Sequence, residues 1–108
     1  MEKLNIDKLI GLNWKRNKIH TSQYIAIDSD YEIHISPDCA YISKQIIYCL
    51  WFINGDTRMD LTTREYPEIK ELYDKIQNIQ NIEYMTYKPM RSHILQMTNY
   101  INEYIIKD

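Results

Sequence analysis

Glycine, proline and cysteine are all scarce in this chain of 108 residues, which has two glycines, three prolines and two cysteines. Because the only glycines are Gly11 and Gly55, no glycine-rich phosphate-binding loop can form. Cys39 and Cys49 make no Cys-x-x-Cys pair and the three histidines are scattered, whereas structural zinc needs four ligands at recognisable spacings. We therefore expect no metal and no cofactor.

Long hydrophobic runs are also absent. The longest, from Ile46 to Ile53, is far shorter than the ~20 apolar residues of a membrane-spanning helix. The first residues, Met-Glu-Lys-Leu-Asn-Ile-Asp-Lys, contain no apolar segment of the signal-peptide kind. We expect a cytoplasmic protein with no membrane partner, in a reducing environment that disfavours the alternative of a Cys39–Cys49 disulfide.

The overall composition is that of a folded domain. Hydrophobic residues make up 44% of the chain and charged residues 26%, which are ordinary shares for a globular protein. A chain of this length usually forms a single domain, so we expect residues 1–108 to fold as one unit. The net charge of −2 disfavours a protein that binds nucleic acid over its whole surface.

The N-terminal third predicts a short helix over residues 2–12, a basic loop and then a β-hairpin. Isoleucines alternate with other residues at Ile25 and Ile27 and again at Ile33 and Ile35, and the Asp-Ser-Asp between them favours a turn. A three-residue loop over 29–31 would place all four isoleucines on one face. The outer face would then carry Tyr24, Asp28, Glu32 and His34.

Residues 36–63 support two interpretations. Ser36-Pro37 is a good helix start and apolar residues follow at helical spacing. Residues 46–53 are nevertheless rich in β-branched and aromatic side chains, and Asn54-Gly55 is a strong hairpin signal. A helix would also expose several large apolar side chains. We predict strands here and keep the helix as the alternative.

The C-terminal half predicts two helices separated by a short strand over residues 82–86. Pro67 begins the first helix and Pro89 the second, each followed by an apolar stripe at helical spacing. The predicted fold is α+β, with a mostly antiparallel sheet of four or five strands and two or three helices packed on one face, including a C-terminal helix. The stripe of that last helix comprises Met90, Ile94, Met97, Ile101 and Tyr104.

Catalysis is not indicated by any convergent set of residues. Cys49 lies in the most apolar run, where a thiol is expected to be buried and inert, and Cys39 has no basic neighbour in sequence. Glu32 and His34 should share the outer face of the hairpin, which would suit a general base or half of a metal site. Solvated polar pairs on a sheet face are far commoner. A small enzyme acting through Cys39 or His34 is the least favoured hypothesis.

The run from residue 14 to residue 18 is the best nucleic-acid signal. It combines an aromatic ring that can stack on bases with three cations that can bind phosphate. The more ordinary interpretation buries the tryptophan in the core and leaves a solvated loop. A nucleic-acid-binding module is therefore the alternative function. Its residues would be Trp14, Lys15, Arg16 and Lys18.

Ten tyrosines are the most unusual feature, because a core of this size cannot hide them all. Tyrosine is enriched at protein–protein contacts, and the stretch from Asp28 to Asp38 contains four carboxylates and no lysine or arginine. The leading hypothesis is therefore a non-catalytic protein-interaction module with a protein partner. The predicted partner-binding residues are Tyr24, Asp28, Asp30, Tyr31 and Glu32.

Size and composition suggest a more specific form of this function. The chain is small, acidic and rich in isoleucine, asparagine and lysine, a bias common in genes of low GC content. Such a protein would suit a phage or mobile element, as an inhibitor of a host protein such as a defence nuclease in the bacterial cytoplasm. The wide apolar surface of the predicted last helix would also suit a homodimer.

Overall fold

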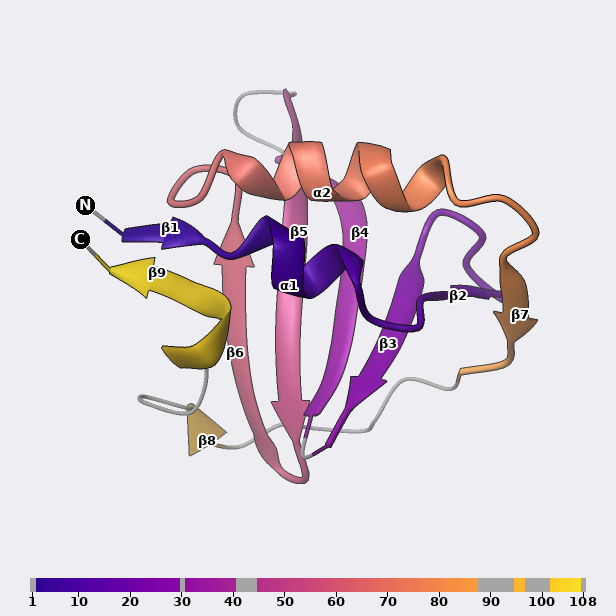
Figure 1. Ribbon diagram of the computed structural model, residues 1–108, viewed down its shortest axis with the longest axis horizontal. Coiled ribbons are helices and arrows are strands. Elements are labelled where there is room, and N and C mark those ends of the chain that lie inside the picture. The colour runs from indigo at the N-terminus through magenta and orange to yellow at the C-terminus, as the bar shows by residue number, and fades with distance from the viewer. Residues whose placement is uncertain (1, 30, 41–44, 88–94, 97–101, 108) are drawn as a thin grey trace.

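The computed structural model describes residues 2–29, 31–40, 45–87, 95–96 and 102–107, and its architecture is α+β, as predicted (Figure 1). Its described residues form a seven-stranded sheet, a separate two-stranded ribbon, two α-helices and one 3-10 helix. No described helix is long and apolar enough to cross a membrane. In chain order the elements are β1 (Glu2–Leu4), α1 (Ile6–Ile10), β2 (Lys15–Asn17), β3 (Tyr24–Asp28), β4 (Tyr31–Ala40), β5 (Gln45–Asn54), β6 (Thr57–Thr62), α2 (Glu68–Gln77), β7 (Glu83–Met85), β8 (Leu95–Gln96), the 3-10 helix η1 (Asn102–Tyr104) and β9 (Ile105–Lys107).

The large sheet has the order β7-β2-β3-β4-β5-β6-β8. Neighbours from β2 to β6 are antiparallel, whereas the outer pairs β2–β7 and β6–β8 are parallel. β1 and β9 pair antiparallel in the small ribbon. The sheet is therefore mixed and larger than predicted. The short strand β7 lies within the strand predicted over residues 82–86. The unpredicted strands β2 and β8 have three and two residues, too few to show an alternating pattern in the sequence.

The β3–β4 hairpin has a two-residue turn and not the predicted three-residue loop. Asp28 pairs with Tyr31, so only positions 29 and 30 lie between the strands. Ser29 has a φ of 49°, in the left-handed region that tight hairpin turns require at their central positions. The predicted register is therefore wrong by one residue.

The shifted register divides the four isoleucines between the two faces of the sheet, because successive strand residues alternate in direction. Ile33 and Ile35 belong to the core cluster beneath the helices, whereas Ile25 and Ile27 point to the opposite side. Ile25 is nevertheless only 1% exposed. The prediction assumed one buried face, but this sheet buries side chains on both of its faces.

Residues 36–62 contain long strands, which confirms the strand interpretation and excludes the helical alternative for the described part. β4 and β5 pair continuously from Glu32 opposite Ile53 to Ala40 opposite Gln45. Gly55 takes the first central position of the β5–β6 turn with a φ of 59°, a conformation that glycine adopts without steric cost.

Pro37 fits within β4 because of the side to which its backbone points. Its partner across the hairpin is Tyr48. The Tyr48 N–H donates to the Thr63 hydroxyl oxygen over 3.2 Å, and the Tyr48 carbonyl accepts from the Thr63 N–H over 3.0 Å, so both groups point away from Pro37. Pro37 therefore sits in a non-hydrogen-bonded pair with Tyr48. The backbone nitrogen of Pro37 therefore points away from β5, to the side of β4 where β3 has already ended. A strand tolerates proline at such an unpaired edge, because no N–H donor is needed there.

The two α-helices lie on one face of the large sheet, as predicted (Figure 1). α2 begins directly after Pro67 and buries a stripe toward the sheet, also as predicted. In the short α1, the Asn5 side chain accepts a hydrogen bond from the Lys8 backbone N–H and so caps the first turn. The stripe of α2 consists of Ile69, Leu72, Tyr73 and Ile76.

The predicted C-terminal helix is wrong wherever the structure describes this region, which forms β8, η1 and β9. Tyr104 is buried as predicted, but it packs between Phe52 and Tyr31 of the sheet. The spacing of apolar residues indicates which side chains are buried, but it does not determine whether the backbone between them is helical. The homodimer stays a prediction without that helix as support. The other members of the predicted stripe, Met90, Ile94, Met97 and Ile101, lie outside the described residues.

Candidate interaction surface

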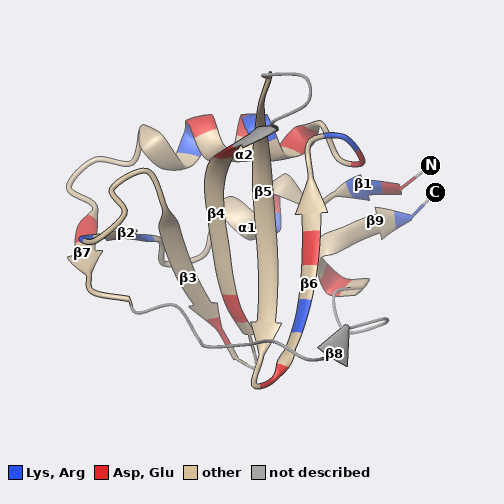
Figure 2. Cartoon of the chain, turned by 180° about the vertical axis from the view of Figure 1, so that it is seen from behind, with Lys and Arg blue, Asp and Glu red and all other residues tan. Residues whose placement is uncertain are grey.

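The face of the large sheet opposite the helices, here called the back face, carries two cross-strand rows of side chains. Strands β3, β4, β5 and β6 contribute one residue each to both rows. Figure 2 views this face, and none of the described helices lies over it. One row consists of Ile27, Glu32, Ile53 and Arg58, and the other of Ile25, His34, Trp51 and Asp60.

His34 lies buried near the middle of the back face, with 4% of its surface exposed. Its Nε2 is 3.5 Å from Oε2 of Glu32, and the Tyr87 ring meets the imidazole edge-on with 4.5 Å between ring centres. Burial and the neighbouring Glu32 carboxylate raise the pKa of Tyr87 to about 12. Glu32 and His34 share a face as predicted, but His34 is not solvated, because Tyr87 packs against it.

The end of the sheet that carries the β3–β4 and β5–β6 turns, here called the turn end, is acidic. Its described residues, 27–29, 31–32 and 53–60, include the carboxylates of Asp28, Glu32, Asp56 and Asp60 and one lysine or arginine, Arg58. Nε of Arg58 lies 3.0 Å from Oδ1 of Asp60, which neutralises one of the four. Figure 2 shows these acidic positions on β3, β4, β6 and the adjoining turn. The turn end therefore has a net negative charge among its described residues.

An exposed isoleucine borders this acidic end. Ile27 is 64% exposed, because the pairing of β2 with β3 stops at Lys15 opposite Ile25 and leaves Ile27 without a neighbour on that side. A hollow of about 100 Å³ occupies the space, lined by these three residues together with Asn13 and Met85. The back face thus offers an apolar hollow beside negative charge.

Two of the predicted partner-binding residues belong to the core. Tyr24 and Tyr31 are buried on the helix face. Tyr24 meets Tyr73 of α2 edge-on with 5.7 Å between ring centres, and Tyr31 meets Tyr104 in the same way at 5.8 Å. The expectation that these two tyrosines are exposed is wrong, because the shifted register turns Tyr24 inward and extends β4 to Tyr31.

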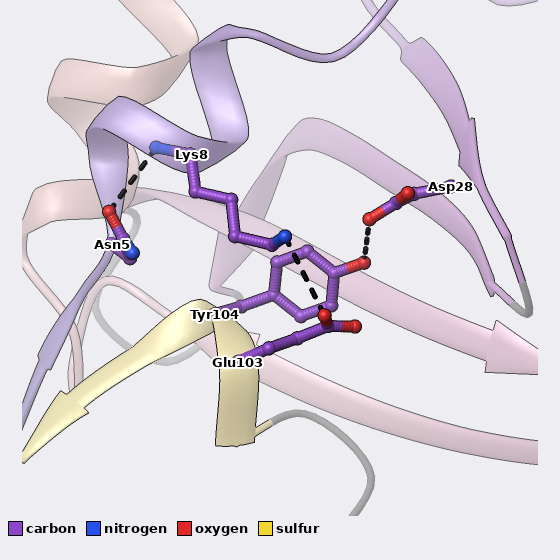
Figure 3. A network of polar contacts seen from close by, with 5 residues as sticks. All are labelled: Asn5, Lys8, Asp28, Glu103 and Tyr104. Carbon is purple, nitrogen blue, oxygen red and sulfur yellow. Dashed lines mark hydrogen bonds and ion pairs between the residues drawn. The ribbon is translucent and has the colours of Figure 1, made fainter.

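Asp28 also faces the helix side, where its carboxylate accepts a hydrogen bond from the buried Tyr104 hydroxyl (Figure 3). Nζ of Lys8 lies 5.3 Å above the same ring and 3.6 Å from the Glu103 carboxylate. Burial and then the Asp28 carboxylate raise the pKa of Tyr104 above its ordinary value. Asp28 therefore provides the hydrogen-bond acceptor for the buried Tyr104 hydroxyl of the C-terminal segment.

The remaining predicted partner-binding residues are Asp30 and Glu32. Asp30 lies outside the described residues. Glu32 turns Oε2 toward His34 and keeps its side chain 37% exposed on the back face. Glu32 is thus the predicted residue that the structure places on the back face beside exposed apolar surface.

The middle of the basic stretch 14–18 forms strand β2 (Lys15–Asn17) and not the predicted loop. Trp14 is buried, and its indole N–H donates to a backbone carbonyl of α1 over 2.8 Å. Nζ of Lys15 lies 2.8 Å from the Glu83 carboxylate, and Nε of Arg16 donates to a carbonyl of the following turn over 2.6 Å. Of the four predicted nucleic-acid-binding residues, Lys18 is exposed, whereas Lys15 and Arg16 contact other parts of the chain. The buried ring of Trp14 cannot stack on a base.

Cys49 is a buried, free thiol, which confirms its predicted burial. Burial, with further contributions from the carboxylates of Asp38 and Asp60, raises its pKa to about 11, so the unreactive thiol form prevails at neutral pH. The side chain of Cys39 lies outside what the structure describes. Within the described part of the chain, no group of three or more histidine, cysteine or acidic side chains is placed to hold a metal ion.

A second, polar hollow of about 240 Å³ lies where β4 continues beyond the end of β3. It is lined by side chains that bear hydroxyl, amide and imidazole groups, together with one proline. His34 lines neither this hollow nor the one beside Ile27. The lining residues are His20, Ser22, Gln23, Ser36 and Pro37.

Sequence reasoning missed four residues that shape the back face. Ile27 was assigned to the buried face of the hairpin, an error that follows from the register. Arg58 and Asp60 alternate with the apolar residues of β6, a pattern that does place them together on the opposite face. Tyr87 reaches His34 from a distant part of the chain, and no local pattern signals such a contact.

No protein-family model matches this chain, and neither a curated protein nor a solved structure matches it. No family assignment follows. The function of the back face must therefore be argued from its own residues and their geometry.

Proposed function

We propose that this chain is a non-catalytic protein-interaction module that binds a basic protein surface through the turn end of its back face. The observation that carries the proposal is Ile27, which is 64% exposed directly beside the carboxylate of its cross-strand partner Glu32. Apolar contact supplies affinity at protein interfaces. Complementary charge speeds the encounter and fixes the orientation of the partner.

The chemistry of the potential catalytic groups supports a non-catalytic role. His34 lies in a buried cluster with Glu32 and Tyr87, and 4% of its surface reaches solvent. Cys49 is held as a thiol by its raised pKa, and a thiol is a poor nucleophile. A base or nucleophile must reach a substrate to act on it, and these two groups do not lie at an open surface.

The more specific form of the proposal is an inhibitor encoded by a phage or another mobile element, acting in the bacterial cytoplasm. Host defence nucleases suit the surface chemistry, because proteins that bind nucleic acid carry basic patches for phosphate. A negative turn end beside an apolar residue is complementary to such a patch. The partner would then be blocked where its nucleic acid binds.

The test is a pull-down with paired charge variants, carried out in lysates of candidate bacterial hosts. The double variant Glu32→Gln/Asp56→Asn removes two charges from the turn end, whereas Glu71→Gln/Asp74→Asn removes two from α2. We expect the wild type and the α2 variant to retain the same partner and the turn-end variant to lose it. Equal recovery by both variants, or no protein partner for the wild type, would contradict the proposal.

The nucleic-acid alternative has lost most of its support, because Trp14 is buried and Lys15 is paired with Glu83. It still makes a clear prediction, which is binding of DNA or RNA that weakens steeply with salt. Such binding should disappear in the triple alanine variant of Lys15, Arg16 and Lys18. A wild-type protein that binds neither DNA nor RNA at low salt would exclude this alternative.

A further inference from the structure

We infer that the hollow beside Ile27 is an anchor site for one aliphatic side chain of a basic peptide segment in the partner. The inference rests on the proposed protein-binding function and specifies the chemistry of the segment that is bound. It depends on two separate features, which are the shape and apolar lining of the hollow and the charges at its rim.

The hollow exists because β2 is shorter than β3. Ile25 forms a buried wall, Ile27 an exposed rim, and Met85 and the stem of Lys15 the sides. Its volume of about 100 Å³ equals that of roughly three molecules of liquid water. That is room for a small branched aliphatic side chain. Burying such a side chain would release water from apolar walls.

The charges around the hollow select a basic segment. On one side, Lys15 is neutralised by Glu83 over 2.8 Å. On the other side, beyond Ile27, the next side chain is Glu32, which is 37% exposed and has no cationic partner among the described lysines and arginines. Asp56 follows at the turn. A lysine or arginine next to the anchor residue is attracted here, and an acidic residue is repelled.

The spacing of the two features suggests a motif. Glu32 lies about two strand spacings from the hollow, or roughly 10 Å. In an extended peptide, residues i and i+2 point to the same side and are roughly 7 Å apart, and a lysine side chain covers the remaining distance. The favoured segment therefore has an aliphatic residue with a lysine or arginine two positions away.

Methyl NMR on the full chain, labelled at isoleucine and methionine methyl groups, tests this directly. The probe is the capped peptide Lys-Gly-Leu-Gly-Lys, compared with a version that has alanine for leucine and one that has glutamate for both lysines. We expect saturable shifts at Ile27 and Met85 with the leucine peptide. Its alanine version should bind at least roughly tenfold more weakly, since three fewer carbons are buried.

The two comparisons separate the inference from the proposed function. Equal affinity of the leucine and alanine peptides, or absence of shifts at Ile27 and Met85, would overturn the anchor site. Equal affinity of the lysine and glutamate peptides would instead count against a basic partner, and so against the proposed function. A preference for leucine together with a preference for lysine supports both.

A matched pair of surface variants completes the test. Ile27 and Ile46 are both 64% exposed, and Ile46 lies at the other end of the sheet on the helix face. Ile27→Ser should weaken binding of the leucine peptide to the level of the alanine peptide, whereas Ile46→Ser should leave it unchanged. Loss of binding in both variants, with folded spectra, would overturn the inference.

Discussion

The buried hydroxyl of Tyr104 donates a hydrogen bond to Asp28 and so ties the C-terminal segment to the end of strand β3 (Figure 3). The ring of Tyr104 packs against Phe52 and Tyr31, with 5.0 and 5.8 Å between ring centres. The two ends of this contact are far apart in sequence. Aromatic packing and this hydrogen bond therefore hold the C-terminal segment against the helix face of the sheet at its turn end.

Removing either partner of this bond should destabilise the protein, but unequally. Asp28→Ala leaves a buried hydroxyl without an acceptor and should cost about 1–3 kcal/mol of unfolding free energy. Tyr104→Phe removes the hydroxyl itself and should cost about 0.5–1.5 kcal/mol. Urea denaturation of both variants and of the double variant measures the difference. A larger loss for Tyr104→Phe than for Asp28→Ala would show that this bond is not what holds the segment.

The buried thiol of Cys49 should make stability depend on alkaline pH. Its pKa rises from the ordinary 9.0 to about 11 in the fold, so the folded protein keeps this proton after the unfolded chain has lost it. The stabilising contribution is complete below pH 9.0 and disappears as the pH rises to about 11. In a Cys39→Ser background, we expect Cys49→Ala to reduce the fall in unfolding free energy over this range. An unchanged pH slope would contradict the raised pKa.

Some of this fold follows directly from local patterns. Pro67 and the apolar stripe after it specify α2, because a helix start and a period of 3.6 residues agree over ten positions. Gly55 marks the β5–β6 turn for a similar reason, since only glycine takes its conformation without strain. In both places one local rule is sufficient and no distant contact has to be known.

Other features depend on contacts that the sequence does not display. Ile25 and Ile27 have the same local pattern, yet Ile25 is buried and Ile27 exposed, because β2 ends between them. The burial of His34 depends on Tyr87, and that of Tyr24 on Tyr73 of α2. The candidate surface was therefore only partly predictable: Glu32 could be placed on it, whereas the hollow and its rim required the strand lengths.

Tyr87 should protect His34 from solvent. Tyr87→Ala should expose the imidazole and cost about 0.5–1.5 kcal/mol beyond the loss of buried area, which is typical of an aromatic pair. Tyr84→Ala is the matched control, because Tyr84 is a nearby tyrosine that is already more than half exposed, and it should change stability by less than about 0.5 kcal/mol. Urea denaturation and the imidazole NMR signals of His34 report the two effects. Equal effects of the two substitutions would show that Tyr87 does not cover His34.

The two glycines should respond in opposite directions to alanine. Gly11 has a φ of −74° and an added Cβ would meet only ordinary contacts at 3.5 and 3.6 Å, so Gly11→Ala should raise the unfolding free energy by about 0.4–1 kcal/mol by restricting the unfolded chain. Gly55 has a φ of 59° with open space around it, so Gly55→Ala should lower it by about 1–2 kcal/mol through backbone strain alone. Urea denaturation of the two variants measures both changes. A stabilising Gly55→Ala would mean that the β5–β6 turn is not built on a left-handed residue, and with it the register that places Asp60 beside Trp51 would have to be revised.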